Sequence, residues 1–124
     1  MKKQKALAIL AILCAMALAL SSCASKGSVT IVEKTPNRAF DITMKAWTLQ
    51  DTVTLNLNAG DELHVDIQCE TGDVAMDIAG QNGSTPYSGK ALADMTFTVT
   101  VEETDTYTVT LKGNQATGTV TLAP

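Results

Sequence analysis

The stretch "LHVDIQCE", residues 63–70, decides the fold class. Its apolar residues Leu63, Val65, Ile67 and Cys69 alternate with polar residues at every second position. Because successive side chains of a β-strand point to opposite faces, this alternation predicts a strand with one face in a core and the other in water. The same period-two pattern recurs at 53–57, 74–78, 95–101, 107–111 and 120–122.

Short polar segments between these stretches predict chain reversals. They are "NAGD" (58–61), "ETGD" (70–73), "GQNG" (80–83), "ETD" (103–105) and "KGNQ" (112–115). Gly, Asn and Asp tolerate left-handed backbone or hydrogen-bond to their own chain, which favours turns. Further strands at 28–34 and 39–47 bring the prediction to seven or eight antiparallel strands, and the segment near 86–89 is an additional short candidate. This spacing is typical of an all-β antiparallel β-sandwich, here spanning residues 29–124.

The N-terminal part of the chain has a different composition. Three lysines within the first five residues precede an apolar run from Ala6 to Leu20, and two serines follow. A charged head, an apolar middle and a small-residue end are the parts of a secretory signal. The run is shorter than the roughly 20 residues with which a helix spans a bilayer. This favours a removable signal helix, with a retained anchor helix as the alternative.

The end of that run, Leu20-Ser21-Ser22-Cys23, resembles the lipobox of bacterial lipoproteins. The resemblance implies that residues 1–22 are a signal peptide that is removed, and that Cys23 becomes the lipidated N-terminus. Its thiol would carry a diacylglycerol and its amine an acyl chain such as palmitate, with residues 23–28 as lipidated cysteine and linker. Cys14 does not fit, because Leu13 before it is not small. The implied location is the outer face of the cytoplasmic membrane, or the outer membrane where the organism has one.

Charge and cysteine content limit which partners the protein can bind and whether a disulfide can stabilise it. From Cys23 onward the chain has six cationic and thirteen carboxylate side chains, a net charge of −7. An acidic surface disfavours nucleic acid and anionic lipid headgroups as partners. With Cys23 lipidated, Cys69 has no partner for an intrachain disulfide, so we expect the fold to depend on its core. The alternation places Cys69 on the core face as a small hydrophobe.

Signatures of catalysis are missing from the sequence. The one histidine, His64, lies on the polar face of its predicted strand. The chain has no Gly-x-Ser-x-Gly elbow, no phosphate-binding glycine loop and no Ser-x-x-Lys motif. We therefore expect a non-catalytic domain without a cofactor.

Carboxylates gather around one predicted hairpin. They are Asp61, Glu62, Asp66, Glu70, Asp73 and Asp77. Calcium takes six to eight oxygen ligands, and Asp73 and Asp77 share one strand face. The spacing does not follow the Asp-x-Asp-x-Asp-Gly loop, so we predict solvated strand faces and no metal site. A structural calcium site stays open as the alternative.

Two aromatic residues are candidates for a ligand patch. Trp47 breaks the alternation of the strand that contains it, and Tyr87 lies in a Pro-, Gly- and Ser-rich segment. Carbohydrate binding uses exposed aromatic faces, so Trp47 and Tyr87 are the weak candidate ligand-binding residues. The competing interpretation is that Trp47 closes an edge of the sandwich and Tyr87 packs over a loop.

The segments "LNAGDELHVDIQCETGDVAMDIAG" (57–80), "YSGK" (87–90), "FTVTVEETDTYTVTLKG" (97–113) and "ATGTVTL" (116–122) together resemble a second family. They are similar to pre-peptidase C-terminal-like and GOLD-like jelly-roll domains, including those of small Firmicutes lipoproteins. The resemblance implies an accessory or binding domain. Our hypothesis is a membrane-anchored lipoprotein of the cell envelope that binds a protein partner, and the alternative is a glycan- or small-ligand-binding lipoprotein. An exposed Trp47 and Tyr87 would favour glycan, and a flat, weakly charged edge strand would favour protein.

Overall fold

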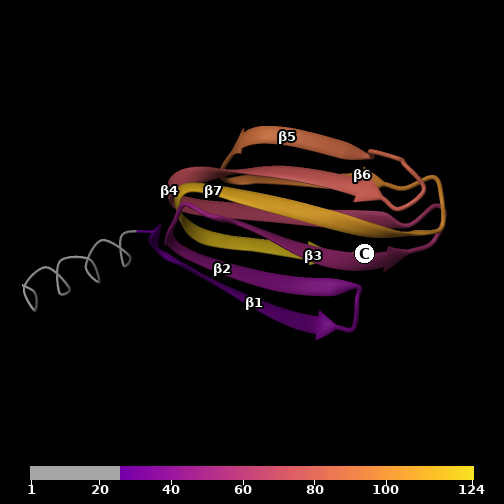
Figure 1. Ribbon diagram of the computed structural model, residues 1–124, viewed down its shortest axis with the longest axis horizontal. Helices are drawn as coiled ribbons and strands as arrows, with labels where there is room; N and C mark the ends of the chain where they lie inside the picture. Colours follow the sequence, from indigo (N-terminus) through magenta and orange to yellow (C-terminus); the bar gives the residue numbers. More distant parts are fainter. Residues whose placement is uncertain (1–25) are drawn as a thin grey trace, which may run out of the picture.

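The computed structural model describes residues 26–124, in which seven strands and no α-helix are present (Figure 1). The strands are β1 (Ser28–Thr35), β2 (Ala39–Trp47), β3 (Gln50–Leu57), β4 (Glu62–Gly80), β5 (Tyr87–Leu92), β6 (Met95–Thr100) and β7 (Asp105–Ala123). All pairings are antiparallel, which confirms the predicted fold class. Residues 26–124 contain no helix with the length and hydropathy of a membrane span. The predicted signal helix and lipobox lie outside the described residues.

The two longest strands, β4 and β7, each pass through both layers of the sandwich. The first half of β4 pairs with the second half of β7, from His64–Ala123 to Cys69–Gly118, and also with β6. The second half of β4 pairs with the first half of β7 and with β5. Since β2 and β3 pair with opposite halves of β7, one layer has the order β1-β2-β7-β4-β6 and the other β3-β7-β4-β5.

Alternating side chains from both layers form a single core. The fully buried large side chains are Trp47, Tyr107, Ile42, Met44, Leu55, Leu57, Leu63, Ile67, Met76, Ile78, Leu111 and Leu122. No polar or charged residue of the described chain is buried among them. The outward positions are rich in Thr, which suits a pleated, solvated face.

Two of the five predicted turns are wrong, because "ETGD" and "KGNQ" lie inside β4 and β7. The β4–β7 register shifts on both sides of Thr71, and Gly72 has a left-handed φ of 70°. A Cβ on Gly72 would collide with the carbonyl oxygen of Asn114 on the facing strand. Gln115 of β7 also has a positive φ of 49°. The polar residues therefore let each strand bend from one layer into the other without reversing, as bulges do.

The connections between strands lie at two ends of the sandwich (Figure 1). We call the end formed by residues 36–38, 58–61, 81–86 and 101–104 the loop end. The bends of β4 and β7 lie at the opposite end, together with the first described residues, since Thr48 donates its N–H to the Lys26 carbonyl over 3.1 Å. Strand β3 has eight residues and runs between the two ends, which are thus roughly 25 Å apart.

Candidate functional site

The structure does not bring the candidate ligand residues Trp47 and Tyr87 together. Trp47 is only 2% exposed and belongs to the core. A Cβ on Gly113 would lie 2.6 Å from Cε3 of the Trp47 ring, so the indole packs directly on the backbone of β7. Tyr87 is half-buried and stacks on Phe97, with ring centroids 4.6 Å apart. An aromatic platform built from Trp47 and Tyr87 is therefore absent from the described surface.

A bulge explains why Trp47 faces inward although its position in the alternation is outward. The β2–β7 register shifts between Met44 and Trp47, and Ala46 has a left-handed φ of 46°. The extra residue on β2 rotates the following side chain to the other face of the strand. The departure from alternation in the sequence thus marks a bulge and not an exposed ring.

The structure confirms the predicted faces of His64 and Cys69. His64 is exposed, and its Nδ1 lies 3.1 Å from the Thr98 hydroxyl on β6. Cys69 is 8% exposed and is a free thiol. Burial raises the pKa of the Cys69 thiol, and the nearby Asp94 and Asp73 carboxylates raise it further. A raised pKa keeps the thiol protonated near neutral pH, where it is a poor nucleophile.

The carboxylates of the acidic hairpin are spread over separate hydrogen bonds. Asp73 accepts from the Asn114 amide at 3.4 Å, and Asp77 accepts from the Ser88 hydroxyl. Within residues 26–124 no three side chains among His, Cys, Asp and Glu are grouped as metal ligands. Asp73 and Asp77 therefore contact different partners in the described part of the chain.

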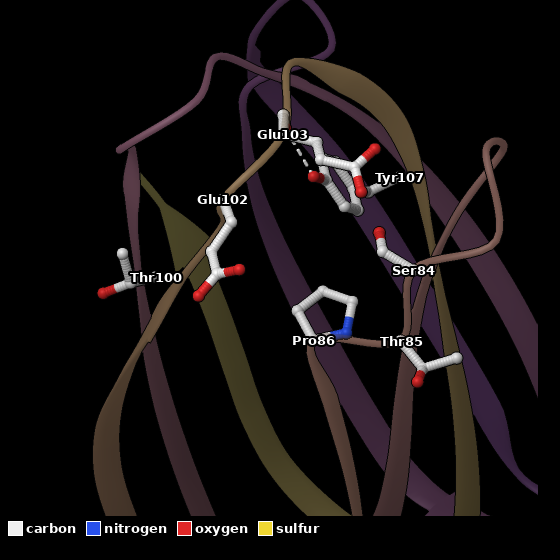
Figure 2. A pocket seen from close by; sticks show the side chains of 7 residues that line it. All are labelled: Ser84, Thr85, Pro86, Thr100, Glu102, Glu103 and Tyr107. Atoms are coloured by element: carbon white, nitrogen blue, oxygen red, sulfur yellow. Dashed lines mark hydrogen bonds between the residues drawn. The ribbon is translucent and has the colours of Figure 1, made fainter.

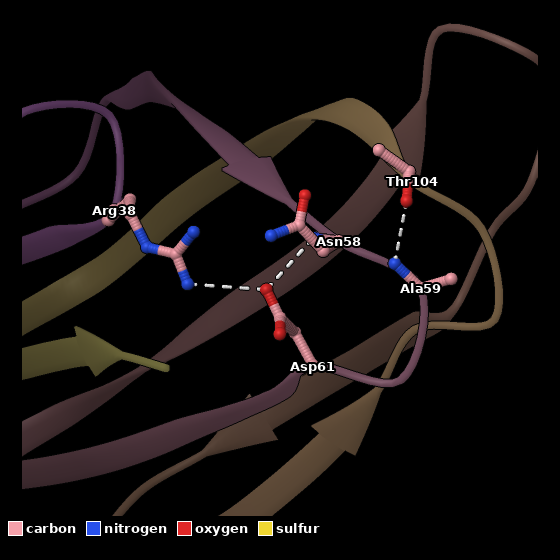
Figure 3. A network of polar contacts seen from close by, with 5 residues as sticks. All are labelled: Arg38, Asn58, Ala59, Asp61 and Thr104. Atoms are coloured by element: carbon pink, nitrogen blue, oxygen red, sulfur yellow. Dashed lines mark hydrogen bonds and ion pairs between the residues drawn. The ribbon is translucent and has the colours of Figure 1, made fainter.

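A polar network connects three turns at the loop end (Figure 3). The Asp61 carboxylate accepts the Asn58 N–H at 2.8 Å and forms an ion pair with Arg38 at 3.2 Å. On the far side of the same turn, the Ala59 N–H donates to the Thr104 hydroxyl at 2.8 Å. These contacts join the β1–β2, β3–β4 and β6–β7 connections, which gives the loop end a fixed shape.

Beside this network is a hollow of about 300 Å³ (Figure 2). It is lined by Ser84, Thr85, Pro86, Thr100, Glu102, Glu103 and Tyr107. The Tyr107 hydroxyl donates to the Glu103 carbonyl, which holds the connection after β6 against β7. The carboxylates of Glu102 and Glu103 are exposed, and no Lys or Arg lines the hollow. This part of the loop end is therefore negatively charged.

Strand β6, which enters the hollow at Thr100, is an edge of its layer. It pairs with β4 on one side, and no described strand pairs with its other side. Val101, just after β6, donates its N–H to the Asp61 carbonyl and accepts from the Gly60 N–H. Because backbone groups of a strand alternate in direction, the N–H and C=O groups of Thr96, Thr98 and Thr100 point away from β4. They form an open edge of the sheet.

Sequence reasoning missed both the hollow and the open edge of β6. The hollow combines residues from two connections that are distant in the sequence, so no local pattern marks it. The edge did leave a signal, because "MTFTVT" (95–100) is an uncharged strand between Asp94 and Glu102. That signal identifies a strand without identifying its neighbours.

Comparison with known proteins finds solved structures of similar fold but no matching sequence. No protein-family model matches the sequence, and no curated protein matches it. The pre-peptidase C-terminal domain of a Bacillus anthracis collagenase is similar in structure, with a TM-score of 0.49 and 13% identity over 70% of this chain and 87% of that one. A structure described as "CBM4 structure and function" has a TM-score of 0.41 and 14% identity, over 79% of this chain and 74% of that one. A complex of accessory secretory proteins 1, 2 and 3 from Streptococcus pneumoniae gives 0.39 and 13%, over 79% and 83%. Similarities of this size are consistent with a small β-sandwich and carry no information on function.

Proposed function

We propose that this chain is a lipoprotein of the bacterial cell envelope, anchored through lipids on Cys23, whose β-sandwich binds another protein and is not a catalyst. The lipobox pattern at Leu20-Ser21-Ser22-Cys23 supports the anchor. A diacylglycerol with a further acyl chain gives stable attachment, whereas a single chain holds only marginally. The anchor would lie in the outer face of the cytoplasmic membrane, or in an outer membrane if the organism has one.

One observation carries the binding role, namely where the chain enters the fold. β1 begins at Ser28 at the end of the sandwich opposite to the loop end (Figure 1). The linker, residues 24–28, has a reach of at most about 18 Å. An anchor at Cys23 would therefore hold the end with the bends of β4 and β7 close to the membrane. The loop end, and with it the Thr100 end of β6, would then face away from the membrane, where a partner can reach them.

The placement of the histidine and the carboxylates, the side chains that could act in catalysis, supports a non-catalytic role. His64, Asp66 and Asp73 lie on solvated faces and are engaged in separate hydrogen bonds. The glycan alternative depended on an exposed aromatic pair. Since Trp47 is a core residue and Tyr87 stacks on Phe97, no observation favours this alternative, and we do not propose it.

The anchor is tested with Cys23→Ala in the full chain, with Cys14→Ala as the matched control. We expect Cys23→Ala to accumulate as unprocessed precursor or to leave the membrane fraction, since no thiol remains to receive the diacylglycerol. Cys14→Ala should be processed and retained like the wild type. Mass spectrometry of the mature N-terminus then identifies the lipid. Normal processing of Cys23→Ala with unchanged retention would contradict the proposal.

A further inference from the structure

We propose that the open edge of β6 is the surface at which the domain binds its protein partner. The partner would add an extended segment with an uncharged, alternating centre and a Lys or Arg at each end. This inference deepens the binding role proposed above and rests on it. Its four supports are the backbone of β6, the protection of the other edge strands, the charges that flank β6 and the apolar side chains along it.

The backbone of β6 is ready to pair with another strand. Thr96, Thr98 and Thr100 direct their N–H and C=O groups away from β4, and within residues 26–124 no other group hydrogen-bonds to their N–H groups. All six β6–β4 pairs are in continuous register, from Glu62–Thr100 to Ile67–Met95. A regular edge of this kind, without a bulge in its pairing, supports the main-chain hydrogen bonds of strand addition.

On β3, the edge of the other layer, outward N–H groups already have acceptors. The Thr52 N–H donates to the Asp51 carboxylate at 2.8 Å. The Asn56 N–H donates to the Asn37 carbonyl at 2.7 Å. A strand added to β3 would have to replace both contacts. β3 is therefore blocked at two of its outward positions.

The edges β1 and β5 are protected in other ways. β1 contains Glu33 and Lys34, and its register with β2 shifts between Glu33 and Thr35. β5 contains Lys90, its register with β4 shifts, and Ala91 has a left-handed φ of 54°. Charges and bulges on edge strands oppose the addition of another strand. Among the four edges of the described sandwich, β6 alone has neither.

Charges at both ends of β6 indicate the occupant. Asp94 precedes the strand, and Glu102 and Glu103 follow it, all three exposed. One oxygen of Asp94 accepts the Cys69 N–H at 3.0 Å, and its charge is not paired with a cation of the described chain. The two ion pairs of residues 26–124, Lys34–Asp41 and Arg38–Asp61, do not include them. Asp94 and Glu102 are eight positions apart, which corresponds to about 27 Å of extended chain. A partner strand with a cation at each end would match this spacing.

The same charges oppose a second copy of this chain at the edge. Antiparallel pairing of two β6 strands centred on Thr98 would place Asp94 of each copy opposite Glu102 of the other. Like charges directly opposite each other destabilise a strand pair. The charge pattern therefore favours a different protein with basic flanks over self-association.

Apolar side chains on the core side of β6 determine the centre of the partner segment. Met95 is 37% exposed, and Phe97 is half-buried against the Tyr87 ring. An added strand would place every second side chain over this rim. Apolar residues at those positions, alternating with Thr or Ser, would cover it as cross-strand neighbours do.

The test measures peptide binding to the purified full-length chain in detergent, by fluorescence anisotropy. The probe is a peptide of about nine residues with Lys at both ends and alternating Thr and Val between, and a second peptide carries Glu in place of Lys. We expect the Lys peptide to bind and the Glu peptide to bind at least about tenfold more weakly, with added salt weakening the Lys peptide.

Thr98→Pro removes an outward N–H while leaving the pairing with β4 in place, because edge strands tolerate proline at such positions. We expect it to weaken binding about tenfold. Thr54→Pro is the matched control, because Thr54 has the same outward direction on β3 as Asn56. It should leave binding unchanged, with circular dichroism confirming that both variants are folded.

Hydrogen exchange gives a readout without a substitution. The Lys peptide should slow exchange of the Thr96, Thr98 and Thr100 amides and leave the Thr54 amide unchanged. The proposal is overturned if neither peptide binds, if both bind equally, if Thr98→Pro has no effect, or if sedimentation shows dimers that Thr98→Pro dissociates. Because these measurements use detergent, they are independent of the membrane fractionation that tests Cys23.

Discussion

The two sides of the sandwich differ in how the outward backbone groups of their edge strands are protected. On the β1–β3 side, a side-chain carboxylate and a turn carbonyl take up N–H groups of β3, and β1 carries charges and a bulge. On the β5–β6 side, the aromatic pair Tyr87 and Phe97 closes the gap between the layers, while β6 keeps its outer backbone groups unpaired. The comparison shows that burial of side chains and protection of backbone are separate properties of an edge. A chain can complete its core and still leave one strand ready for a partner.

The largest expected difference between the two sides is in their aromatic residues. Trp47→Ala should lower the free energy of unfolding by about 3–5 kcal/mol, since it removes a fully buried indole. Tyr87→Ala should cost about 1 kcal/mol, because the half-buried ring loses mainly its stacking on Phe97. Urea denaturation followed by circular dichroism measures both. Equal losses would contradict the assignment of Trp47 to the core and Tyr87 to the rim.

Truncating an aliphatic residue should also lower the free energy of unfolding more on β3 than on β6, but the difference should be smaller than for the aromatic residues. Leu55 of β3 is fully buried, and Leu55→Ala should cost about 2–5 kcal/mol. Val99 of β6 is 5% exposed and has a smaller side chain, so Val99→Ala should cost about 1–2 kcal/mol. Unfolding in urea is again the measurement. A larger loss for Val99 would mean that β6 contributes more to the core than its burial indicates.

A smaller effect is expected from removing the protection of β3. Asp51→Ala deletes the acceptor of the Thr52 N–H, and the Thr52 amide should exchange about fivefold faster. Asp51→Asn is the control, because its side-chain oxygen can still accept. In the strand-addition assay, Asp51→Ala should also let β3 bind extended peptides weakly. Unchanged exchange at Thr52 would remove the proposed difference between β3 and β6.

The smallest effect is the contribution of Cys69 to the pH dependence of stability. Its thiol pKa is raised above the usual 9.0, first by burial and then by Asp94 and Asp73. The unfolded chain therefore ionises its thiol at lower pH than the folded protein. The stabilising contribution is complete below about pH 9 and is lost as the pH rises through the folded pKa. Comparing the wild type with Cys69→Ala in urea at increasing alkaline pH checks this, and a parallel pH dependence of the two would refute it.

Local patterns predicted most of the fold. The alternation at 63–69 and its repeats identified the strands, and the inward and outward assignments of Cys69 and His64 were correct. Of the predicted turns, those near 58–61, 80–83 and 103–105 lie between strands. The segments 70–73 and 112–115 were not turns, because Gly and Asn allow a bend within a strand as readily as a reversal. Whether such a segment reverses depends on which strands it lies between, and this is a long-range property.

The candidate site was less predictable, for a related reason. Trp47 was a candidate because it breaks the alternation, and a bulge at Ala46 turns it into the core. The bulge forms against β7, which is about 70 residues further along the chain, so the local sequence does not define it. The open edge of β6 follows from the absence of a second neighbouring strand in the described sandwich, and only the complete set of pairings reveals it.

The sequence by itself determined the class of fold, the strand faces and the acidic charge, because these follow from period-two alternation and from composition. It also carries the lipobox pattern on which the proposed anchor depends. Only the tertiary structure decided that β4 and β7 cross both layers, that Trp47 is a core residue, and that β6 is an open edge between carboxylates. The physical reason is that side-chain alternation is local, whereas hydrogen-bond pairing between strands joins residues far apart in the chain.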